Sequence, residues 1–454
     1  MIALSLSQIA PLLEAEMFGG DASFGSVSSD TRTLTPGDLF VALQGTNFDG
    51  HDYLETARER GAVAVLVSRA ISGGLPGLRV RDTKIALGRL AAFWRQHSAA
   101  PLIGVTGSNG KTTVKEMIAA TLGRRGSVLA TRGNYNNDIG LPLTLLRLQE
   151  QAFAVVEMGA NNPGEIEYLS RIAAPDVALI TNAGRAHLAG FGTLEGVARA
   201  KSEILTGLKP DGWFVLNADD PSADFWREQA GTHRTISFGV ERPADVSSPK
   251  EALELHWSAS GFVSRFPVFL SGSKVEIALA LAGDHNRMNA LAAIAVAQVL
   301  GTSRDDIQIG LAAMKPVPGR LQSLPGRNGA SVINDSYNAN PDSVKAAINL
   351  LASAPGRRWL VLGELAEMGA TGAELYRELG DYARQSGIDR IAALGAAGQV
   401  ATACGARGEH FHSIHELIDR LVAESQPGDW ILIKGSRAAR MERVVEALSA
   451  EEAV

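Results

Sequence analysis

Short apolar runs alternate with longer stretches of helical spacing through the middle of this chain of 454 residues. Each run is apolar at nearly every position, which is typical of strands buried on both faces of a sheet. The pattern therefore predicts a mostly parallel sheet flanked by helices. The runs are LIGVT at 102–106, FAVVEM at 153–158, VALITN at 177–182 and WFVLN at 213–217.

The segments on both sides of this region carry patterns of their own. Before it, short strands at 38–43 and 63–67 lie between polar turns, which predicts a small α/β unit. After it, apolar runs end in glycine before helical stretches, as in a doubly wound α/β domain. These runs lie at 359–363, 390–395 and 430–435, and none of their glycines completes a dinucleotide-binding fingerprint.

These patterns predict an α/β protein of three domains, at residues 1–82, 83–312 and 313–454, which suits the length of the chain. Shorter alternating strands with Gly, Ser and Pro at 232–283 predict an antiparallel excursion from the central sheet. A helix is expected at 285–300.

The amino-acid composition excludes several classes of protein. The chain has 49 Asp and Glu against 43 Lys and Arg, and its basic residues are scattered, so no nucleic-acid surface is expected. The first 18 residues carry Glu14 and Glu16 and no cationic leader, so we expect an amphipathic helix and no signal peptide. No apolar run approaches membrane-spanning length. The single cysteine, Cys404, excludes a disulfide within one chain and fits a reducing cytoplasm.

The most informative stretch, residues 102–118, is an apolar run followed by a glycine-bearing turn and a helix. The N–H groups of such a turn and the helix dipole point at one spot, where a lysine can reach the terminal phosphates of a nucleotide. The general pattern G-x-x-x-x-G-K-[ST] has a glycine where this chain has Val105, so the loop is a variant. The expected nucleotide contacts are Gly107, Ser108, Asn109, Gly110, Lys111, Thr112 and Thr113.

Candidate metal ligands follow neighbouring strands. Glu157 ends an apolar strand and could share Mg²⁺ with the Thr112 hydroxyl, since this ion prefers oxygen ligands; the alternative is a glutamate in a surface turn. His187 lies in a loop after another strand and is either functional or structural. Lys201 lies on a helix that Thr193 can cap, and from the residues alone it is a solvated lysine.

Further polar candidates lie toward the C-terminus. Asn286 and Asn289 share a face at a helix start, where they could bind a purine edge or cap the helix. Arg320 follows two prolines that would hold its loop rigid. The polar segment 334–342, which contains Asp335, is either part of a site or a turn before an Asp-capped helix.

A series of long motifs occurs along the chain: TGSNGKTT, NYNNDIGLPLTLL, EMGANNPGEI, NAGRAHL with AKSEI, GDHNRMNALAA, PGRLQ and NDSYNANPDSVKAA. In this order the motifs resemble those of the Mur ligases of peptidoglycan synthesis, over nearly the whole chain. The SYNANPDS sequence, and the lack of the DNPR sequence of the ligase that adds the third residue, make the chain most similar to the branch that adds D-alanyl-D-alanine.

The resemblance implies a fold and an ATP-dependent ligation. The fold would comprise a small N-terminal UDP-binding domain, a central P-loop ATPase domain and a C-terminal Rossmann-like domain. The terminal carboxylate of UDP-MurNAc-tripeptide would attack the γ-phosphate of ATP, giving an acyl phosphate and ADP. The amine of D-Ala-D-Ala would then displace phosphate to give the pentapeptide, while Mg²⁺ and Lys111 neutralise charge.

The resemblance also implies roles for individual residues. Thr112 and Glu157 would bind one Mg²⁺ and His187 a second, while Lys201 matches the family lysine that CO₂ carboxylates to a metal ligand. This reverses the interpretation of Lys201 from the residues alone. The expected catalytic residues are Lys111, Glu157, His187 and Lys201. Further ATP contacts would be Asn286 and Asn289 at the adenine, Arg320 at the ribose or phosphates, and Asp335.

For the other substrates, the resemblance places the uridine-diphosphate pocket in two N-terminal loops. Asn136 and Asn137 would meet the muramyl peptide, and Arg437 is the candidate for the D-Ala-D-Ala carboxylate. Whether the third residue of the peptide is meso-diaminopimelate or lysine stays open. The pocket residues would be Ser29, Thr31, Arg32, Gly45, Thr46 and Asn47.

Two other interpretations stay open. One is another amide ligase on the same scaffold, either a different Mur ligase or a folylpolyglutamate synthetase, although the first 82 residues argue against the latter. The other is a P-loop nucleotide-binding regulator without ligase activity, and the combination of Lys111, Glu157, His187 and Lys201 weighs against it. We expect a monomer in the bacterial cytoplasm, with domain closure about Pro316–Gly319 because nucleotide contacts come from two domains.

Overall fold

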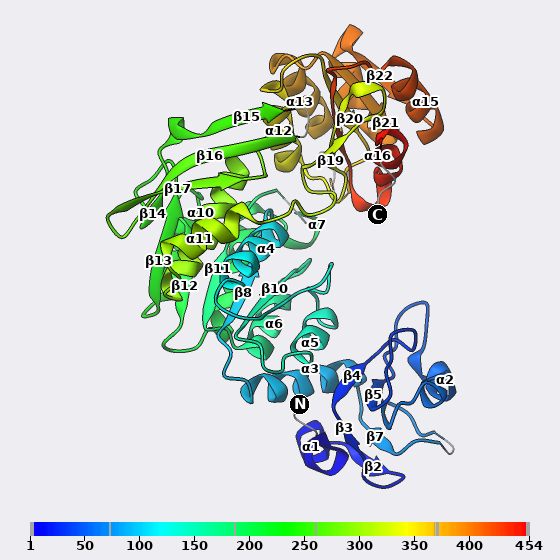
Figure 1. Cartoon of the computed structure of the whole chain (residues 1–454). Helices are drawn as coiled ribbons and strands as arrows, with labels where there is room; N and C mark the ends of the chain where they lie inside the picture. The colour runs from blue at the N-terminus through cyan, green and yellow to red at the C-terminus, as the bar shows by residue number, and fades with distance from the viewer. Residues whose placement is uncertain are drawn as a thin grey trace.

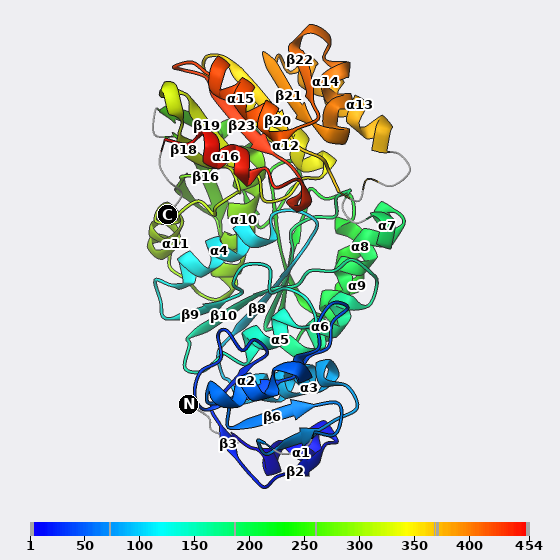
Figure 2. The same cartoon turned by 90° about the vertical axis from the view of Figure 1, so that its right-hand side faces the viewer.

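The computed structural model describes residues 4–71, 74–185, 188–258, 261–366, 368 and 372–450. In this part of the chain, α/β units follow one another along the long axis of the molecule, with the N-terminal unit at one end and the C-terminal unit at the other (Figures 1 and 2). Each unit is built on its own larger sheet, and we name the units N-terminal, central and C-terminal by these sheets.

The sheet of the N-terminal unit has the strand order β2-β7-β6-β5-β4, in which only β2 is antiparallel to its neighbour. The predicted strands at 38–43 and 63–67 are confirmed as β5 and β6. The elements are β1 (Leu4–Ser5), α1 (Leu6–Leu13), β2 (Glu16–Phe18), β3 (Ser23–Phe24), β4 (Ser26–Ser28), β5 (Asp38–Val41), α2 (Leu54–Glu59), β6 (Ala64–Val67) and β7 (Gly77–Arg79).

The helix expected in the first 18 residues is shorter than predicted. It begins after Ser5, whose side chain accepts a hydrogen bond from the Gln8 N–H, and it ends at Leu13. Glu14 then adopts a left-handed backbone with φ of 52°, which stops the helix. The residues that follow form β2 instead.

The central sheet has the order β15-β16-β14-β13-β12-β11-β8-β10-β9, with β17 paired to β16. All four predicted apolar runs form strands of its parallel part: β8, β10, β11 and β12. The strands are β8 (Leu102–Thr106), β9 (Val128–Ala130), β10 (Phe153–Glu157), β11 (Val177–Ile180), β12 (Trp213–Asn217), β13 (Arg234–Gly239), β14 (Val246–Ser247), β15 (Glu254–Ser258), β16 (Gly261–Leu270) and β17 (Ser273–Leu279).

The prediction of an antiparallel excursion over 232–283 is correct only for its later part. Strands β15, β16 and β17 pair antiparallel, but β13 lies parallel to β12 and extends the main sheet. The last four residues of β13 are all buried, so it meets helices on both faces like the other parallel strands. The sequence did not reveal this strand because Arg234, Thr235 and Ser237 interrupt its apolar residues and a glycine and a proline lie nearby.

Helices cover both faces of the central sheet. One face packs against α4 (Lys111–Leu122), α10 (Asp284–Val299) and α11 (Arg304–Ala312). The helix expected at 285–300 is thereby confirmed. The other face packs against α3 (Thr83–Gln96), α5 (Gly140–Leu145), α6 (Glu165–Ala173), α8 (Leu194–Ser202) and α9 (Ala223–Ala230), and α7 spans Leu188–Phe191.

The sheet of the C-terminal unit has the order β18-β19-β23-β20-β21-β22 and is parallel except for the edge strand β18. The three predicted runs form β20, β21 and β23, as expected for a doubly wound domain. The elements are β18 (Gln322–Pro325), β19 (Ser331–Asp335), α12 (Pro341–Ala352), β20 (Arg358–Leu362), α13 (Gly372–Gln385), β21 (Arg390–Leu394), α14 (Gly398–Ala403), β22 (Gly408–Phe411), α15 (Ile414–Glu424), β23 (Trp430–Lys434) and α16 (Glu442–Leu448).

Strand register brings the candidate residues together. Because β8 lies between β10 and β11, Val105 pairs with both Glu157 and Leu179, so these strands end at one edge of the sheet. The turn that begins at Gly107 leaves from this edge, which faces the C-terminal unit (Figure 2). Among the described residues, no helix is both long enough and apolar enough to cross a membrane.

Candidate active site

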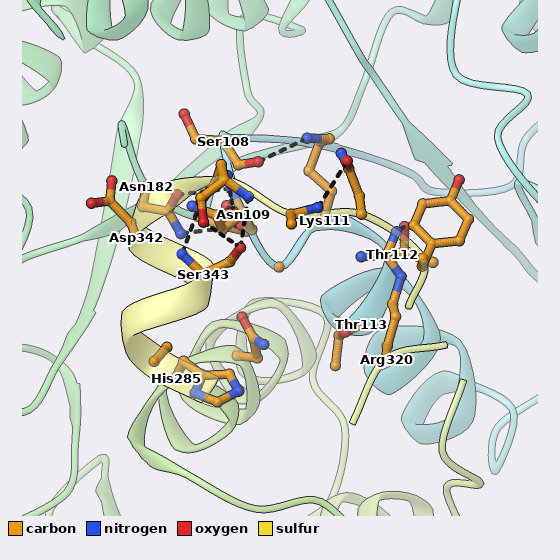
Figure 3. A pocket seen from close by; sticks show the side chains of 18 of the residues that line it. Ser108, Asn109, Lys111, Thr112, Thr113, Asn182, His285, Arg320, Asp342 and Ser343 are labelled. Carbon is orange, nitrogen blue, oxygen red and sulfur yellow. Dashed lines mark hydrogen bonds between the residues drawn. The ribbon is translucent and has the colours of Figure 1, made fainter. Parts of the chain in front are cut away.

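A cavity of about 650 Å³ lies between the central and C-terminal units (Figure 3). The central unit contributes the turn at 108–113, the loop at 134–137 and the start of α10. The C-terminal unit contributes residues 319–321 and 335–343. The cavity therefore joins the candidate residues of two units that are far apart in the sequence.

Glycine is required at two positions of the turn. Gly107 has φ of 142°, and a Cβ there would lie 1.9 Å from Thr181 Oγ1. Gly110 has φ of 83°, and a Cβ there would lie 2.3 Å from Asn289 Oδ1. Val105, in contrast, is a buried strand residue in the core beneath α4, so this variant turn has no need of glycine at that position.

Lys111 begins α4 at the mouth of the turn. Its ammonium donates to the Gly107 carbonyl at 2.6 Å and to the Ser108 carbonyl at 3.4 Å. Burial lowers the pKa of Lys111. The side chain is therefore curled over the turn, in the place where a terminal phosphate would meet both the ammonium and the N–H groups of the helix start.

The Thr112 hydroxyl lies at the meeting point of three segments. It donates to Glu157 Oε2 at 2.8 Å and accepts from Arg320 Nη2 at 2.9 Å. The other oxygen of Glu157 accepts from Asn136 Nδ2 at 2.9 Å. Glu157 is buried with these partners, so its interpretation as a surface-turn glutamate is wrong.

This pair of oxygen groups fits a magnesium ion. A threonine hydroxyl and a carboxylate beside a phosphate-binding turn are donors of the kind that Mg²⁺ takes together with phosphate oxygens. His187 lies outside the described residues, so the expectation of a second metal stays a prediction. Among the residues that are described, no group of three or more His, Cys, Asp and Glu side chains could hold a metal ion.

Lys201 is buried, with 2% of its surface exposed, so the interpretation as a solvated lysine is wrong. Two effects lower the pKa of Lys201 to about 7: burial, which is the larger, and repulsion from the charge of Lys111. Its ammonium lies 5.2 Å from the centre of the Phe191 ring. At physiological pH, Lys201 is therefore a neutral amine in a substantial fraction of the molecules. Thr193 caps the helix as predicted, accepting from the Gly196 N–H.

The two asparagines at the start of α10 are buried on one face of the helix. Asn289 Nδ2 donates to Asn286 Oδ1 at 3.1 Å, and Asn286 Nδ2 donates to the Ala282 carbonyl at 2.9 Å. Both line the cavity, and Asn289 packs against Gly110. They thus lie directly beside the glycine-bearing turn at 107–113, which is the expected phosphate-binding turn.

The C-terminal unit adds charged groups to the same cavity. The Arg320 guanidinium lies 4.2 Å from the centre of the Tyr337 ring. Asp335, at the end of β19, accepts from Lys434 Nζ at 2.6 Å. Arg437 also lines the cavity, but its side chain is largely exposed and lies 3.6 Å from Glu442. The segment 334–342 precedes α12, whose capping residue is Asn340 and not an aspartate.

The N-terminal loops lie away from this cavity. Ser29, Thr31 and Arg32 follow β4, while Gly45, Thr46 and Asn47 follow β5; β4 and β5 are parallel neighbours, so both loops leave the same edge of their sheet. The Arg32 side chain is paired with Asp30, at 2.7 Å, and is mostly exposed. Of the predicted substrate contacts, Asn136, Asn137 and Arg437 line the cavity.

Sequence reasoning assigned no role to several residues of the site. Arg185 and Asp342 join the two units across the rim, and His285 and Lys434 line the cavity wall. The available signal was position: Arg185 follows the end of β11, and Lys434 ends β23. His285 lies within the motif GDHNRMNALAA, but nothing in that motif set it apart from its neighbours.

The fold and the cavity together define a P-loop nucleotide-binding protein whose site is completed by a second α/β unit. Family models match three stretches of the chain: "Mur ligase family, catalytic domain" at 24–95, "Mur ligase middle domain" at 105–297, and "Mur ligase, glutamate ligase domain" at 319–437.

Individual relatives match over nearly the full length. The UDP-N-acetylmuramoyl-tripeptide–D-alanyl-D-alanine ligase of Escherichia coli (strain K12) is 44% identical over 452 residues, covering 99% of both chains. A crystal structure of MurF from Acinetobacter baumannii is 34% identical, with a TM-score of 0.91 over 98% of both chains. MurF from Thermotoga maritima in complex with ADP is 30% identical, with a TM-score of 0.83 over 93% of this chain and 96% of that one. The chain belongs to the Mur ligase family.

Proposed function

We propose that this protein is an ATP-dependent ligase that joins D-alanyl-D-alanine to UDP-N-acetylmuramoyl-tripeptide in peptidoglycan synthesis. The observation that carries the proposal is the Thr112–Glu157 pair beside Lys111, in a cavity that the C-terminal unit closes. The Escherichia coli relative bears this activity in its name and matches along 99% of the chain. The Thermotoga maritima relative was solved in complex with ADP, which supports the binding of an adenine nucleotide by this chain.

The first step joins two anions. A carboxylate oxygen of the tripeptide attacks the γ-phosphorus of ATP, the bond to the β-phosphate oxygen breaks, and ADP leaves. Lys111 and the N–H groups at the start of α4 would stabilise the negative charge on the transferred phosphoryl group. When bound at Thr112 and Glu157, Mg²⁺ would supply further charge neutralisation between the phosphates.

The second step forms the amide bond. The amine of D-Ala-D-Ala attacks the acyl phosphate carbon, the amine loses a proton, and phosphate departs with one oxygen of the original carboxylate. Arg320 and the 335–343 segment would exclude water from the acyl phosphate, since both line the same cavity. We further propose that Arg437, at the exposed end of the cavity, binds the carboxylate of the incoming dipeptide.

The properties of Lys201 support its proposed carboxylation. Only the neutral amine reacts with CO₂, and a pKa of about 7 makes this form accessible at physiological pH. The resulting carbamate would be an anion beside Lys111 and would relieve the repulsion between two buried cations. With His187, it would complete the site for a second Mg²⁺.

The remaining assignments are proposals of the same kind. The loops after β4 and β5 would hold the uridine diphosphate, and Asn136 and Asn137 the muramyl peptide, so the substrate would run from the N-terminal unit into the cavity. We also propose domain limits near residues 82 and 312. The protein would be a monomer in the bacterial cytoplasm. The location fits the buried, unpaired thiol of Cys404.

The test is phosphate release by the purified chain. With ATP, Mg²⁺, UDP-MurNAc-tripeptide and D-Ala-D-Ala, release should require both acceptor substrates and should be accompanied by UDP-MurNAc-pentapeptide in mass spectra. Release with folate and glutamate, or with a different muramyl peptide and amino acid, would transfer the assignment to another amide ligase. Nucleotide binding without any release under all these conditions would favour a regulator.

A further inference from the structure

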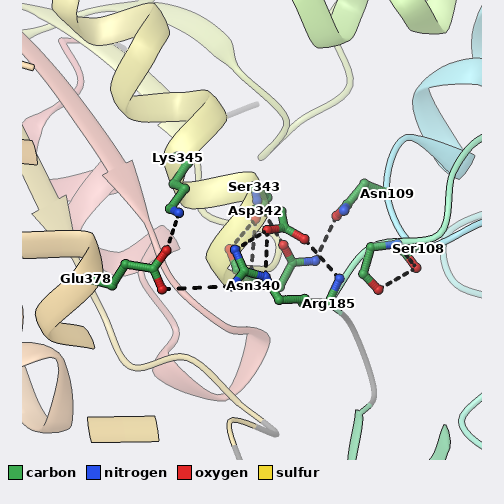
Figure 4. A network of polar contacts seen from close by, with 9 residues as sticks. Ser108, Asn109, Arg185, Asn340, Asp342, Ser343, Lys345 and Glu378 are labelled. Carbon is green, nitrogen blue, oxygen red and sulfur yellow. Dashed lines mark hydrogen bonds and ion pairs between the residues drawn. The ribbon is translucent and has the colours of Figure 1, made fainter. Parts of the chain in front are cut away.

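A polar network joins the central and C-terminal units at the rim of the cavity (Figure 4). Its centre is Arg185, in the loop after β11, and Asp342, in the first turn of α12. The Arg185 backbone N–H donates to Asp342 Oδ2 at 2.9 Å, while its Nε and Nη2 donate to Oδ1 at 3.1 and 3.0 Å. Both carboxylate oxygens are thus engaged by one residue of the other unit.

A second contact of α12 reaches the phosphate-binding turn itself. Asn340, the capping residue of α12, donates from Nδ2 to Asn109 Oδ1 at 2.8 Å. Asn109 is held in turn by Asn182, which accepts from its N–H at 2.9 Å and donates to its carbonyl at 3.1 Å. The first turn of α12 is therefore fixed to the turn that would bind phosphate.

The loop of Arg185 is also tied to this turn. The Gly184 N–H donates to Ser108 Oγ at 2.9 Å, and the Ser108 hydroxyl donates back to the Gly184 carbonyl at 3.2 Å. A Cβ at Gly184 would lie 3.1 Å from Asp342 Oδ2 and 3.3 Å from Asn109 Nδ2. The phosphate-binding turn, the Arg185 loop and α12 consequently meet at one point.

A second contact between the central and C-terminal units, away from the Arg185–Asp342 pair, is apolar. Trp257, on β15, packs edge to face against Trp430, on β23, with ring centres 4.6 Å apart. Phe262, on β16, belongs to the core of the C-terminal unit. Figure 1 shows this β15–β16 hairpin reaching from the central sheet to that unit. Phe262 and Trp430 are buried and Trp257 is partly buried, whereas the Arg185 and Asp342 side chains are 31% and 34% exposed. A partly exposed ion pair exchanges readily with solvent, so the polar contact is the one that can open.

We propose that Arg185 is a positioning residue that, through Asp342, locks the C-terminal unit onto the phosphate-binding turn. The lock brings Arg320 and Asp335 into the cavity that holds Lys111. Arg185 contacts no reacting group in this role. The assignment of the cavity to ATP, and hence the effect of the lock on turnover, rests on the function proposed above.

The test compares the single variants Arg185→Gln and Asp342→Asn, the double variant, and Arg185→Lys. The control, Arg420→Gln, removes an ion pair with Glu409 that is internal to the C-terminal unit. Each protein is measured for its KM for ATP, its kcat, its affinity for a non-hydrolysable ATP analogue, and its radius of gyration with and without that analogue.

Each single variant should raise the KM for ATP and weaken analogue binding by about five- to tenfold, as expected for loss of a partly exposed ion pair with good geometry. It should also reduce the compaction caused by the analogue. The double variant should be no worse than Arg185→Gln, because each substitution removes the Arg185–Asp342 pair. Arg185→Gln also removes the longer contact of 3.8 Å between Arg185 and Glu378, so its effect should be at least that of Asp342→Asn. Arg185→Lys should lie between wild type and Arg185→Gln, and the control should match wild type.

Effects that multiply in the double variant, or single variants that match the control, would overturn the lock. A single variant could unfold at a lower temperature than the Arg420→Gln control. In that case Arg185→Lys, which retains the positive charge, is used to decide the outcome by the same measurements. The scattering and analogue-binding results need no turnover. A wild-type protein that compacts with the analogue but ligates nothing would therefore contradict the proposed function and leave the lock intact.

Discussion

The Thr112 hydroxyl donates to a carboxylate oxygen of Glu157 at 2.8 Å, although the two residues are 45 positions apart and belong to different elements. The parallel pairing of β8 with β10 places the end of one strand beside the turn that follows the other. Arg320, from the C-terminal unit, donates to the same hydroxyl. The Thr112 hydroxyl oxygen thus lies where the proposed phosphate-binding turn, the proposed metal ligand Glu157 and the C-terminal unit meet.

Glu157→Gln should make turnover strongly dependent on added Mg²⁺. The amide keeps the shape and the contact with Thr112 but removes the negative charge that would hold the ion. We expect kcat to fall by about 10²–10³-fold and the Mg²⁺ concentration for half-maximal rate to rise. A titration of initial rate against Mg²⁺ checks this, with the exposed Glu276→Gln as the control. A variant with wild-type Mg²⁺ dependence would remove Glu157 from the metal site.

Carboxylation of Lys201 should depend on pH. Because its pKa is lowered to about 7, the reactive neutral amine increases as the pH rises through this value. Enzyme depleted of CO₂ should regain activity faster after bicarbonate addition at pH 8 than at pH 6. Lys201→Arg should stay inactive under both conditions, while the exposed Lys274→Arg should behave as wild type. Full activity of Lys201→Arg would contradict the role of this lysine.

The same pKa shift should affect stability. The pKa of Lys201 is about 7 in the folded protein and 10.5 as the reference value, so the unfolded state binds more protons between these values and the free energy of unfolding rises with pH across this window. In CO₂-free buffer, Lys201→Met should raise the free energy of unfolding at pH 7 by roughly 2–4 kcal/mol, and by much less near pH 10. Urea unfolding at both pH values measures it. An equal difference at both would contradict the shift.

Arg320→Lys should weaken ATP use despite the retained charge. Lysine lacks the planar fork that both stacks on Tyr337 and donates to Thr112. A rise in the KM for ATP of about tenfold is expected, with a smaller change in kcat. Steady-state kinetics separate the two constants, and Arg443→Lys on α16, outside the cavity, is the control. An unchanged KM would exclude Arg320 from the nucleotide site.

Cys404 should be unreactive in the native protein. Burial raises the pKa of its thiol to about 11, and Sγ donates to the Gly380 carbonyl at 3.0 Å. A thiol reagent at pH 8 should therefore label it only after denaturation, because the thiolate is the nucleophile. Rapid labelling of one thiol per folded chain would contradict this packing.

The parallel strands β8, β10, β11 and β12 were predictable because they are apolar at nearly every position, a pattern that burial on both faces demands. β13 was not, since polar residues interrupt it and glycine, serine and proline residues lie around it. The placement of Gly107 and Glu157 at one edge also followed from the sequence, because parallel strands end together.

Other features of the site depend on tertiary structure. Lys201 lies on a helix with charged neighbours in the sequence, and only packing against the core removes it from water. Arg185 and Asp342 are 157 positions apart and have no shared motif, so no local pattern could pair them.

The transfer of a carboxylate oxygen to phosphate reports most directly on ligation through an acyl phosphate. UDP-MurNAc-tripeptide labelled with ¹⁸O in its terminal carboxylate would be incubated with ATP, Mg²⁺ and D-Ala-D-Ala, and the released phosphate analysed by mass spectrometry. Lys111→Ala would be the control for background hydrolysis. We predict one ¹⁸O atom in each phosphate, accompanied by an equal amount of UDP-MurNAc-pentapeptide. Unlabelled phosphate would show that water attacks ATP and would contradict the ligase mechanism.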